Sequence, residues 1–240
     1  MSDLERARKL SARASRVAVL TGAGISAESG LATFRDSGGL WDKHRVEDVA
    51  TPEAFVRDPA FVWRFYNNLR KAGAAAKPNP GHAALAGLER QGKAVVVLTQ
   101  NVDGLHQRAG SSKVVELHGS LWRARCVTCR STVADLPLDW PLLPRCASCR
   151  GLLRPDIVWF GEALDPNDLG AAAAALQDCD LFMVVGTSAQ VQPAASFAFA
   201  AVERGIGVIE VNKEPTALSG LVAVSLQGPA GEILPALLAA

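Results

Sequence analysis

Residues 16–30 read RVAVLTGAGISAESG, an apolar run that leads directly into a turn rich in glycine. The turn follows the pattern G-x-G-x-x-A, a form of the dinucleotide-binding fingerprint, in which glycines permit a tight bend and a close approach of the backbone to phosphate. The N-terminus of a helix that follows such a turn attracts the same phosphate. Taken alone, the pattern fits a purely structural turn between strand and helix equally well.

Five more short apolar runs recur along the chain, at 94–100, 113–117, 181–187, 207–211 and 221–226. Runs of this length suit strands that are buried on both faces of a parallel sheet. Helical stretches separate them, at 2–14, 59–75, 81–90, 167–177, 193–203 and 231–239. This alternation predicts an α/β fold, a Rossmann-like parallel sheet with helices on both faces.

Two regions interrupt the alternation and are expected to form a smaller lobe. Residues 31–76 hold loop and helix material, and residues 122–154 hold four cysteines with several arginines and prolines. We therefore predict three parts: a Rossmann-like domain of residues 1–30, 77–121 and 155–240, a helical insert of residues 31–76, and a small lobe of residues 122–154.

The composition limits the partners of the protein. The chain has 240 residues, and 49% of them are hydrophobic, which is enough for a sizeable core. With 25 basic and 24 acidic side chains the formal net charge is +1, so no global field favours nucleic acid or an anionic membrane. The N-terminal stretch is charged, and no segment approaches the roughly 18 apolar residues that span a bilayer. We expect a soluble, cytoplasmic protein with no membrane partner.

The spacing of the cysteines indicates a metal site. Cys126 and Cys129 form one C-x2-C pair, Cys146 and Cys149 form another, and 16 residues lie between the pairs. Four thiolates at this spacing fill a tetrahedral zinc shell and leave no position for water, so we expect one structural Zn2+ per chain. The alternative is four reduced thiols without metal. Cys179 lies outside the set and fits a small buried apolar residue.

A zinc ribbon can also bind nucleic acid. Residues 122–154 contain six arginines and two aspartates, a local excess of four positive charges. A zinc-ribbon nucleic-acid-binding module therefore stays open as an alternative function at this point.

Polar and small residues stand at the carboxyl ends of four predicted strands, where open α/β sheets bind their ligands. They are Gln100, Asn101, Asp103, His118, Gly186, Thr187, Ser188 and Asn212. Capping of the next helix would explain Asp103 but neither Gln100 nor Asn101. His118 fits a base that titrates near neutral pH, although an isolated histidine is more often a packing residue.

Several strand ends that converge on one crevice favour a dinucleotide over a mononucleotide. A dehydrogenase would also need an acidic residue about 20 positions after the glycine turn, at the end of a second strand. Glu47 and Asp48 fall in HRVEDVATPE, which does not resemble a strand. An NAD-linked oxidoreductase therefore stays open as the second alternative function, although its ribose-binding acid is not visible in the sequence.

The motifs also occur as a set: GAGISAESG, TFRD, GLW, HRVEDVATPE, TQNVDGLH, LHG, the two cysteine pairs, RPDIVWFGE, GTSAQVQPA and EVN, spread over residues 22–212. In this combination the chain resembles the sirtuin family of NAD-dependent protein deacylases, of the bacterial type. The resemblance implies that the Rossmann-like domain binds NAD, that acyl-lysine proteins or peptides are the substrates, and that nicotinamide and O-acyl-ADP-ribose are released.

In such enzymes the acyl-lysine carbonyl oxygen attacks C1′ of the nicotinamide ribose, nicotinamide leaves, and a histidine deprotonates a ribose hydroxyl that then takes over the acyl carbon. The resemblance assigns catalytic roles to His118, Asn101 and Asp103. It assigns the cofactor pocket to Gly22, Ala23, Gly24, Ser26, Thr33, Phe34, Arg35, Gln100, Asn101, Asp103, Gly186, Thr187, Ser188, Asn212 and Ala230. The loop 33–41 would close over NAD and exclude water.

The resemblance also implies where the acyl peptide binds. The stretch VWFGE, which is Val158, Trp159, Phe160, Gly161 and Glu162, would pair with the peptide as an added strand. Val191 would face it from another loop. Affinity would then come from main-chain bonds, and sequence selectivity would be low. The same aromatic residues also fit plain core, and for Phe160 both interpretations stay open.

The residues expected in the acyl channel differ from those of one branch of the family. Relatives that favour succinyl- and malonyl-lysine carry Tyr-x-x-Arg, whereas this chain reads Tyr66-Asn67-Asn68-Leu69-Arg70. Arg70 lies one position beyond the expected arginine, about 100° further round a helix, and Leu69 takes its place. Tyr66 and Arg70 remain candidate substrate residues, and Leu69 predicts a preference for neutral acyl groups, acetyl before succinyl.

Overall fold

The computed structural model of the protein describes residues 1–32, 40–41 and 44–239. Thr33, Phe34 and Arg35 lie outside the described residues, and so does most of the loop that the sequence predicts to close over NAD. Nothing in the structure therefore bears on these predictions.

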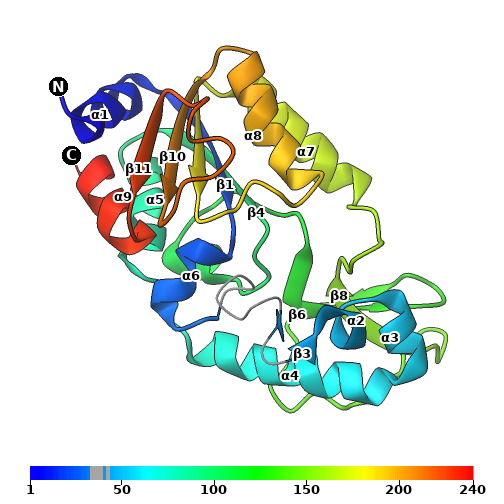
Figure 1. The fold of residues 1–240 in the computed structure, drawn as a ribbon. Coiled ribbons are helices and arrows are strands. Elements are labelled where there is room, and N and C mark those ends of the chain that lie inside the picture. Colours follow the sequence, from blue (N-terminus) through cyan, green and yellow to red (C-terminus); the bar gives the residue numbers. More distant parts are fainter. Residues whose placement is uncertain (33–39, 42–43, 240) are drawn as a thin grey trace.

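A six-stranded parallel sheet lies at the centre of the larger part of the molecule (Figure 1), with the strand order β11-β10-β9-β1-β4-β5. The strands are β1 (Arg16–Thr21), β4 (Ala94–Thr99), β5 (Val114–Glu116), β9 (Leu181–Val185), β10 (Gly207–Asn212) and β11 (Val224–Gln227). Each corresponds to one of the apolar runs, so the prediction of a Rossmann-like parallel sheet is confirmed.

Helices cover both faces of this sheet. Val19 packs on one face with Ala7, Leu85 and Leu234, whereas its neighbour Leu20 packs on the other face. The first face is covered by α1 (Asp3–Arg13), α5 (Pro80–Arg90) and α9 (Ala230–Leu238), and the second by α7 (Pro166–Asp178) and α8 (Ala194–Glu203). The short α6 (Leu105–Ala109) contacts α5. Because successive strand residues point to opposite faces, a strand between two helical layers is apolar throughout.

Side-chain caps fix where the main helices begin. Ser2 and Glu5 form a capping box at the start of α1, in which each side chain bonds the backbone amide of the other residue. Asn79 caps α5 and Asp165 caps α7, each followed by proline at the first helical position. These residues satisfy amides that no helical carbonyl can reach.

The glycine turn after β1 differs from the expectation in one respect. It is followed by two single 3-10 turns, η1 (Ala23–Ile25) and η2 (Ala27–Ser29), and not by an α-helix, and Gly30 ends the second with φ 85°. The Gly24 amide donates to the Gly186 carbonyl at 2.8 Å, which joins the ends of β1 and β9. A long helix dipole is therefore not available at this turn.

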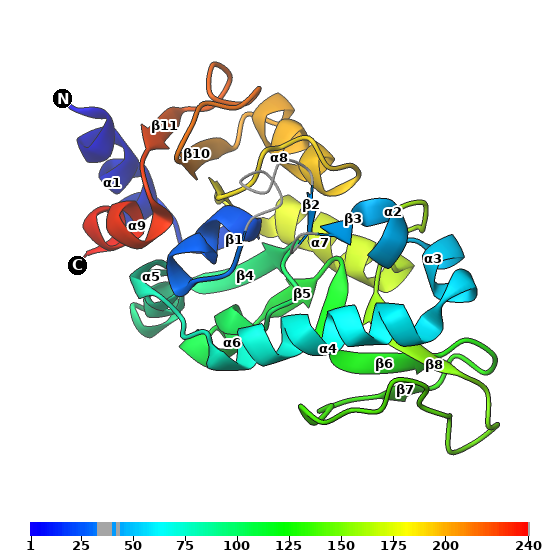
Figure 2. The ribbon, with the colours of Figure 1, turned by 60° about the horizontal axis from the view of Figure 1, so that its bottom comes forward.

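The smaller part packs two helical pieces and a long helix against a second sheet (Figure 2). Its elements are β2 (Leu40–Trp41), β3 (His44–Arg45), α2 (Val46–Val49), α3 (Pro52–Arg57), α4 (Pro59–Ala75), β6 (Gly119–Cys126), β7 (Thr132–Val133) and β8 (Leu153–Ile157). In the second sheet β6 lies between β7 and β8, antiparallel to both. Since β6 begins before residue 122 and β8 ends after residue 154, this sheet extends beyond the predicted small lobe; the division into three parts stays a prediction.

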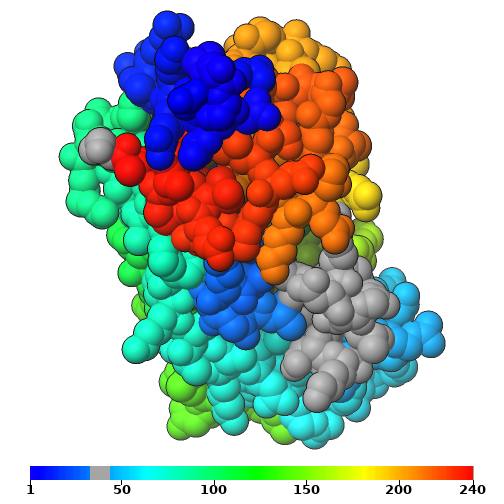
Figure 3. All heavy atoms as spheres, turned by 60° about the vertical axis from the view of Figure 1, so that its left-hand side comes forward, coloured from blue at the N-terminus to red at the C-terminus, as the bar shows by residue number. Residues whose placement is uncertain are grey.

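The two ends of the described chain lie side by side, with α1 next to α9 in the space-filling view (Figure 3). Within the described ranges no helix combines the length and the apolar character needed to cross a membrane.

Candidate active site

A cavity of about 980 Å³ opens where the carboxyl ends of the central strands meet. All six strands contribute to it at or just beyond their last residue, through Gly22, Gln100, His118, Gly186, Asn212 and Gly228. Such a crevice is where open α/β sheets bind nucleotides. Of the predicted cofactor residues, all that the structure describes line this cavity: Gly22, Ala23, Gly24, Ser26, Gln100, Asn101, Asp103, Gly186, Thr187, Ser188, Asn212 and Ala230.

Hydrogen bonds between these side chains fix the strand ends relative to one another. Gln100 Nε2 donates to Thr187 Oγ1 at 2.9 Å, and Asn212 Nδ2 donates to the Thr187 carbonyl at 2.6 Å. Asn101 Nδ2 donates to the Gly22 carbonyl and to Ser26 Oγ, both at 3.1 Å. Hydrogen bonds thus join residues at the ends of β1, β4, β9 and β10 beside the cavity.

The glycines of this network have no room for a side chain, because neighbouring atoms lie too close. A Cβ on Gly24 would lie 2.7 Å from the Gly186 Cα, and a Cβ on Gly22 would lie 2.8 Å from the Thr187 Cβ. Gly186 has φ 62°, and a Cβ there would lie 2.3 Å from the Ile25 amide nitrogen. The turn therefore keeps the backbone of two strands in direct contact beside the cavity.

His118 is held as a neutral base. Its Nδ1 lies 3.1 Å from the Gln100 carbonyl oxygen, which can only accept, so Nδ1 carries the hydrogen and Nε2 is left as the acceptor. Burial lowers the pKa of His118 from its usual 6.5, and the bond to Gln100 opposes that shift. The imidazole that lines the cavity is therefore able to accept a proton at neutral pH.

Asp103 bonds the first amide of α6 and also lies in the lining of the cavity. Its Oδ1 accepts from the amide of Leu105, the first residue of α6, at 2.9 Å. Its Oδ2 accepts from Ser26 Oγ at 2.7 Å, within the lining of the cavity. Burial raises the pKa of Asp103, while these two hydrogen bonds favour the charged form. Capping and participation in the site are thus compatible.

A buried layer of hydroxyl and imidazole groups lies behind the glycine turn. Thr21 Oγ1 donates to Thr99 Oγ1 at 2.8 Å, so it accepts from His106 Nε2 at 2.9 Å. The rings of His106 and His82 meet edge to face with centroids 4.9 Å apart. Burial lowers the pKa of His82 to about 4 and that of His106 to about 3, so both are neutral and support Ser26 and its neighbours without adding charge.

The 102–103 loop is held from the side of the second sheet. The pairing of β6 with β8 shifts register between Ser120 and Ala124. In this interval the Leu121 amide donates to the Val102 carbonyl at 3.0 Å, and the Trp122 indole donates to the Asp103 carbonyl at 3.0 Å. The strand that follows His118 therefore also supports the loop that carries Asp103.

The segment 158–162 lies at the mouth of the cavity, and all five of its residues contribute to the lining. Trp159 is 2% exposed, but Phe160 is 54% exposed, which excludes plain core for Phe160. Val191, in the facing loop, is 42% exposed. The amides of residues 158, 159, 160 and 162 donate within the chain, so this segment is a turn in the structure. Strand addition would have to use the Gly161 amide and carbonyl groups, or open this turn.

An apolar branch of the cavity runs beside α4. Its lining includes Leu69, Ala72, Gly73, Val102, Leu121 and Ile157. Tyr66 and Arg70 are not part of this lining. Tyr66 is fully enclosed and its hydroxyl accepts from the Trp159 indole at 2.9 Å. Arg70 is 0% exposed and its Nη2 donates to Asn67 Oδ1 at 2.6 Å, on another face of the helix. Arg70 follows Leu69 by about 100° round α4 and points away from the cavity. The structure therefore places neither Tyr66 nor Arg70 in the lining of the cavity.

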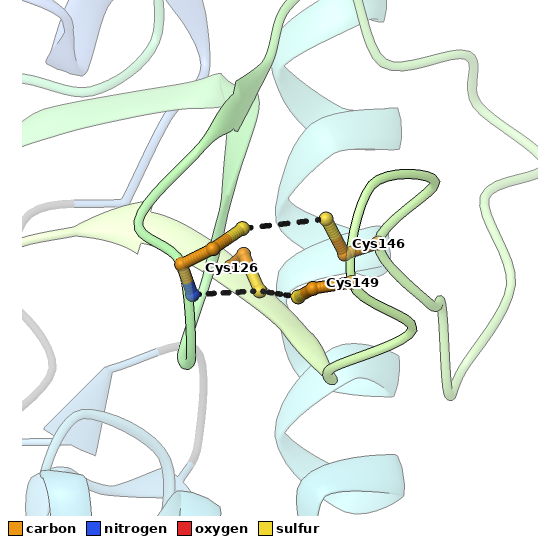
Figure 4. A group of neighbouring side chains, drawn as sticks. Cys126, Cys146 and Cys149 are labelled. Atoms are coloured by element: carbon orange, nitrogen blue, oxygen red, sulfur yellow. Dashed lines mark hydrogen bonds between the residues drawn. The ribbon is translucent and has the colours of Figure 1, made fainter.

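The four cysteines converge at one point beside α4 (Figure 4). Their sulfur atoms all lie within 4.8 Å of one another, and the Cys126–Cys149 and Cys129–Cys146 Sγ distances are 3.5 and 3.7 Å. A tetrahedral zinc with Zn–S bonds of about 2.3 Å has S–S edges of about 3.8 Å, so the arrangement fits a structural zinc. Hydrogen bonds from Ser131 and the Cys149 amide lower the pKa of Cys146 to about 6, whereas a bond from the Gly151 amide lowers the pKa of Cys149 but the neighbouring sulfur atoms raise it to about 12. Bound zinc would hold all four sulfur atoms as thiolates.

The arginines counted in the small lobe are partly neutralised by acids outside it. Arg123 pairs with Glu116 and Asp156. Arg154 pairs with Glu162. These partners were not counted in the local excess of charge, so the case for a nucleic-acid surface is weaker than the sequence suggests. Likewise Glu47 and Asp48 lie in α2, outside the six-stranded parallel sheet and its carboxyl edge, and supply no ribose-binding acid for an oxidoreductase.

Sequence reasoning missed several lining residues. Lys213, Glu214 and Gly228 follow the ends of β10 and β11, and the position after a strand was the available signal for them. Val102, Leu121 and Ile157 carried no signal, because an apolar residue that lines a channel cannot be distinguished in sequence from one in a core.

A parallel sheet with a glycine-lined cavity at its carboxyl edge, together with a four-thiol site in a second lobe, defines a Rossmann-like nucleotide-binding protein with a structural zinc site. Residues 22–193 match the Sir2 family. The chain belongs to this family, as its sequence motifs predict.

Similar proteins cover almost the whole chain. The NAD-dependent protein deacylase 2 of Pyrobaculum aerophilum is 54% identical over 220 residues, 91% of this chain and 88% of that protein. The NAD-dependent protein deacylase of Pyrococcus furiosus is 49% identical over 235 residues, 95% of this chain and 94% of that protein.

Two solved structures are also similar to this protein over almost its whole chain. A complex of a Sir2 homologue with NAD has a TM-score of 0.90 at 43% identity and covers 98% of this chain and 92% of its own. A Sir2 protein bound to a myristoylated histone peptide has a TM-score of 0.79 at 36% identity and covers 98% of this chain and 94% of its own.

Proposed function

We propose that the protein is an NAD-dependent protein-lysine deacylase that consumes NAD and releases nicotinamide and O-acyl-ADP-ribose. The observation that carries this proposal is the neutral imidazole of His118, fixed by the Gln100 carbonyl in a cavity where all six parallel strands end. Membership of the Sir2 family, whose relatives are named as NAD-dependent protein deacylases, supports the same reaction.

NAD would bind across the strand ends. The glycine turn at Gly22 and Gly24 would face the phosphates, and Thr187, Ser188 and Asn212 would hold the adenosine half with Ala230 near the adenine. Gln100, Asn101 and Asp103 would hold the nicotinamide ribose. The network that joins these side chains supports the proposal, because it fixes the polar groups of four strand ends relative to one another at the edge where such sheets bind nucleotides. The described residues offer no acid at a strand end in the position that a dehydrogenase uses, which favours consumption of NAD over hydride transfer.

His118 would act as the general base. Attack of the acyl-lysine carbonyl oxygen on C1′ of the nicotinamide ribose expels nicotinamide. His118 Nε2 would then take the proton of a ribose hydroxyl, whose oxygen would bond to the acyl carbon. Addition of one water and loss of the lysine amine from that carbon would complete the transfer and leave O-acyl-ADP-ribose. The Gln100 carbonyl keeps the hydrogen on Nδ1, so the free lone pair of Nε2 is available throughout. Asn101 and Asp103 would orient the ribose during this sequence.

The acyl peptide would bind at the mouth formed by residues 158–162 and Val191. Phe160 and Val191 are both exposed beside the cavity, as a peptide-binding edge requires. The acyl group would enter the apolar branch beside α4. Leu69 lines that branch, whereas Arg70 is buried elsewhere, so we propose a preference for acetyl and longer neutral acyl groups over succinyl.

The direct test is a nicotinamide assay. The protein is incubated with NAD and an acetyl-lysine peptide, with the same peptide carrying free lysine as the control. We expect nicotinamide and deacetylated peptide in equal amounts, and only when the acetyl group is present. Reduction of NAD, or nicotinamide release that is independent of the acetyl group, would contradict the proposal.

We also infer that the protein works in the cytoplasm. Its four zinc-site thiols must stay reduced to bind metal, and the cytoplasm keeps thiols reduced. Detection of the protein in fractionated cells of its source would test this location.

A further inference from the structure

The turn that forms the mouth of the cavity is held from behind mainly by Arg154, and Arg125 of β6 adds one longer contact, from its Nη2 to Glu162 Oε2 at 3.4 Å. Arg154 lies in β8, and its side chain is 9% exposed. Its guanidinium carbon lies 3.4 Å from the centroid of the Trp159 ring, a stacked cation–π contact. Arg154 is not part of the cavity lining, so any influence it has on the reaction must pass through other residues.

The guanidinium closes a ring around this turn. Arg154 Nη1 donates to Glu162 Oε1 at 2.6 Å, and Nη2 donates to Glu162 Oε2 at 2.9 Å and to the Ile157 carbonyl at 2.8 Å. Glu162 Oε2 also accepts from the Trp159 amide at 2.9 Å. One side chain thus connects the residue before the segment 158–162 to its last residue, with the two-pronged geometry that only arginine provides.

The front of the same turn faces the reaction site. The Val158 amide donates to the His118 carbonyl at 3.0 Å, and the Phe160 amide donates to the Ala50 carbonyl at 3.0 Å. Trp159 points the other way, and its indole donates to Tyr66. With Trp159 clamped at the back, Phe160 is left exposed at the cavity.

We propose that Arg154 is a positioning residue for acyl-peptide binding. It sets the conformation of the segment 158–162 by stacking on Trp159 and pairing with both oxygens of Glu162. It touches neither substrate. The inference rests on the proposed peptide site at this segment, and it adds a residue that controls the shape of that site.

A positioning role and a merely structural role predict different kinetics. If Arg154 only stabilises the fold, its loss lowers the melting temperature and leaves the substrate affinities of the folded enzyme unchanged. If it shapes the peptide site, its loss raises KM for the acyl peptide. KM for NAD stays the same, because the glycine turn and Asn212 are held by bonds that do not involve Arg154.

The test compares Arg154→Met and Arg154→Lys with Arg123→Met in the full-length, zinc-loaded enzyme. Arg123 is a matched control, because it is a partly buried arginine of the neighbouring strand β6 whose ion pairs go to Glu116 and Asp156 and not to the segment 158–162. Nicotinamide release is measured while acetyl peptide and NAD are varied in turn, together with melting temperature and zinc content.

We expect Arg154→Met to raise KM for the peptide about tenfold, since a buried charged hydrogen bond contributes at least that factor. KM for NAD should change less than about twofold, and Arg154→Lys should fall between wild type and methionine, because lysine keeps the charge but loses the fork and the stacking. Arg123→Met should leave both constants near the wild-type values.

Glu162→Gln provides a second route if Arg154→Met does not fold. It should raise the peptide KM selectively as well, and the pair Arg154→Lys with Glu162→Gln should cost less than the sum of the single effects. Equal changes in both KM values, or a lower melting temperature with an unchanged peptide KM, would overturn the inference. A wild-type enzyme that releases no nicotinamide with the acetyl peptide would instead overturn the proposed function.

Discussion

At the scale of single residues, we expect the protonation state of His118 to set the acid limit of the activity. Burial holds its pKa below 6.5, so the imidazole stays neutral and able to accept a proton throughout the neutral range. Protonation removes the acceptor at Nε2. We expect kcat/KM to be level at neutral pH and to fall only below pH 6.5, the usual value. A pH profile with an acid limb above that value would contradict this account.

Replacement of the base should remove activity without removing the fold. We expect His118→Ala to lower kcat by at least about a hundredfold, the usual contribution of a general base. Zinc content and melting temperature should stay near wild type, because within the described residues this side chain is held by a hydrogen bond to the Gln100 carbonyl and contacts no zinc-site cysteine. Turnover of acetyl-lysine near the wild-type rate would rule out His118 as the base.

The acyl preference depends on which residue of α4 faces the channel. Leu69 lines it, so Leu69→Arg should bring a cation to an acyl carboxylate and raise kcat/KM for a succinyl peptide by about tenfold or more. The acetyl peptide should lose activity, because its methyl group loses apolar contact. The matched variant is Arg70→Met, which should leave the ratio of the two rates unchanged. A wild-type preference for succinyl that Arg70→Met removes would refute the assignment.

Much of the site could be predicted because its residues combine an unusual type with a telling position. Gln100, Asn101 and His118 are polar groups directly after buried strands, and burial of such groups is costly unless they bind something. The orientation of Arg70 could not be predicted, since sequence gives the angle of a residue on a helix but not which face the surroundings cover. The contacts of Arg154 could not be predicted for another reason. In sequence, its stacking partner Trp159 cannot be distinguished from an ordinary aromatic residue of the core.

At the scale of elements, the contact between the turn after β1 and the end of β9 should tolerate no side chain. In Gly186→Ala the new Cβ would meet the Ile25 amide nitrogen at 2.3 Å, and φ is 62°. We expect the free energy of unfolding to fall by about 2–4 kcal/mol and NAD binding to be lost. Urea denaturation measures the first effect, and protection by NAD against thermal unfolding measures the second.

Gly170 is the control for this substitution. It lies inside α7, where a Cβ meets nothing within 4 Å. Gly170→Ala should therefore leave NAD binding unchanged and stabilise the protein by about 0.5–1 kcal/mol, since glycine is a poor helix former. Similar losses in both variants would show that the contact between the two strand ends has no special importance.

The strands of the central sheet were predictable from sequence, and those of the second sheet were not. Strands such as β9 lie between two helical layers and are apolar throughout, so they stand out from the helices around them. β6 and β8 carry several arginines, and Arg123 of β6 pairs with Asp156 of β8, so charged side chains mask the alternating pattern of these strands. The 3-10 turns after Gly22 were missed because the fingerprint is the same whether an α-helix follows or not.

At the scale of the whole molecule, the zinc site should control stability and activity together. Removal of zinc with a chelator, or Cys129→Ala, should destabilise the lobe that contains β6 and abolish deacylation, although no cysteine lies near the cavity. Metal analysis, melting temperature and nicotinamide release check this together. Cys179→Ala, which lies outside the cluster, should keep zinc and activity. Full activity after complete loss of zinc would contradict the coupling.

The course of β6 explains why this coupling is expected, and it has a consequence for engineering. Within a few residues the chain passes from His118, through the two groups that support the 102–103 loop, to the zinc ligand Cys126. The zinc lobe is therefore not a cassette that can be exchanged between relatives at any convenient junction. Side chains alternate along a strand, so one residue added between His118 and Cys126 would turn every later side chain to the opposite face. A hybrid enzyme should accept a foreign lobe only when the number of residues between the histidine and the first cysteine is kept, however well the rest of the lobe folds.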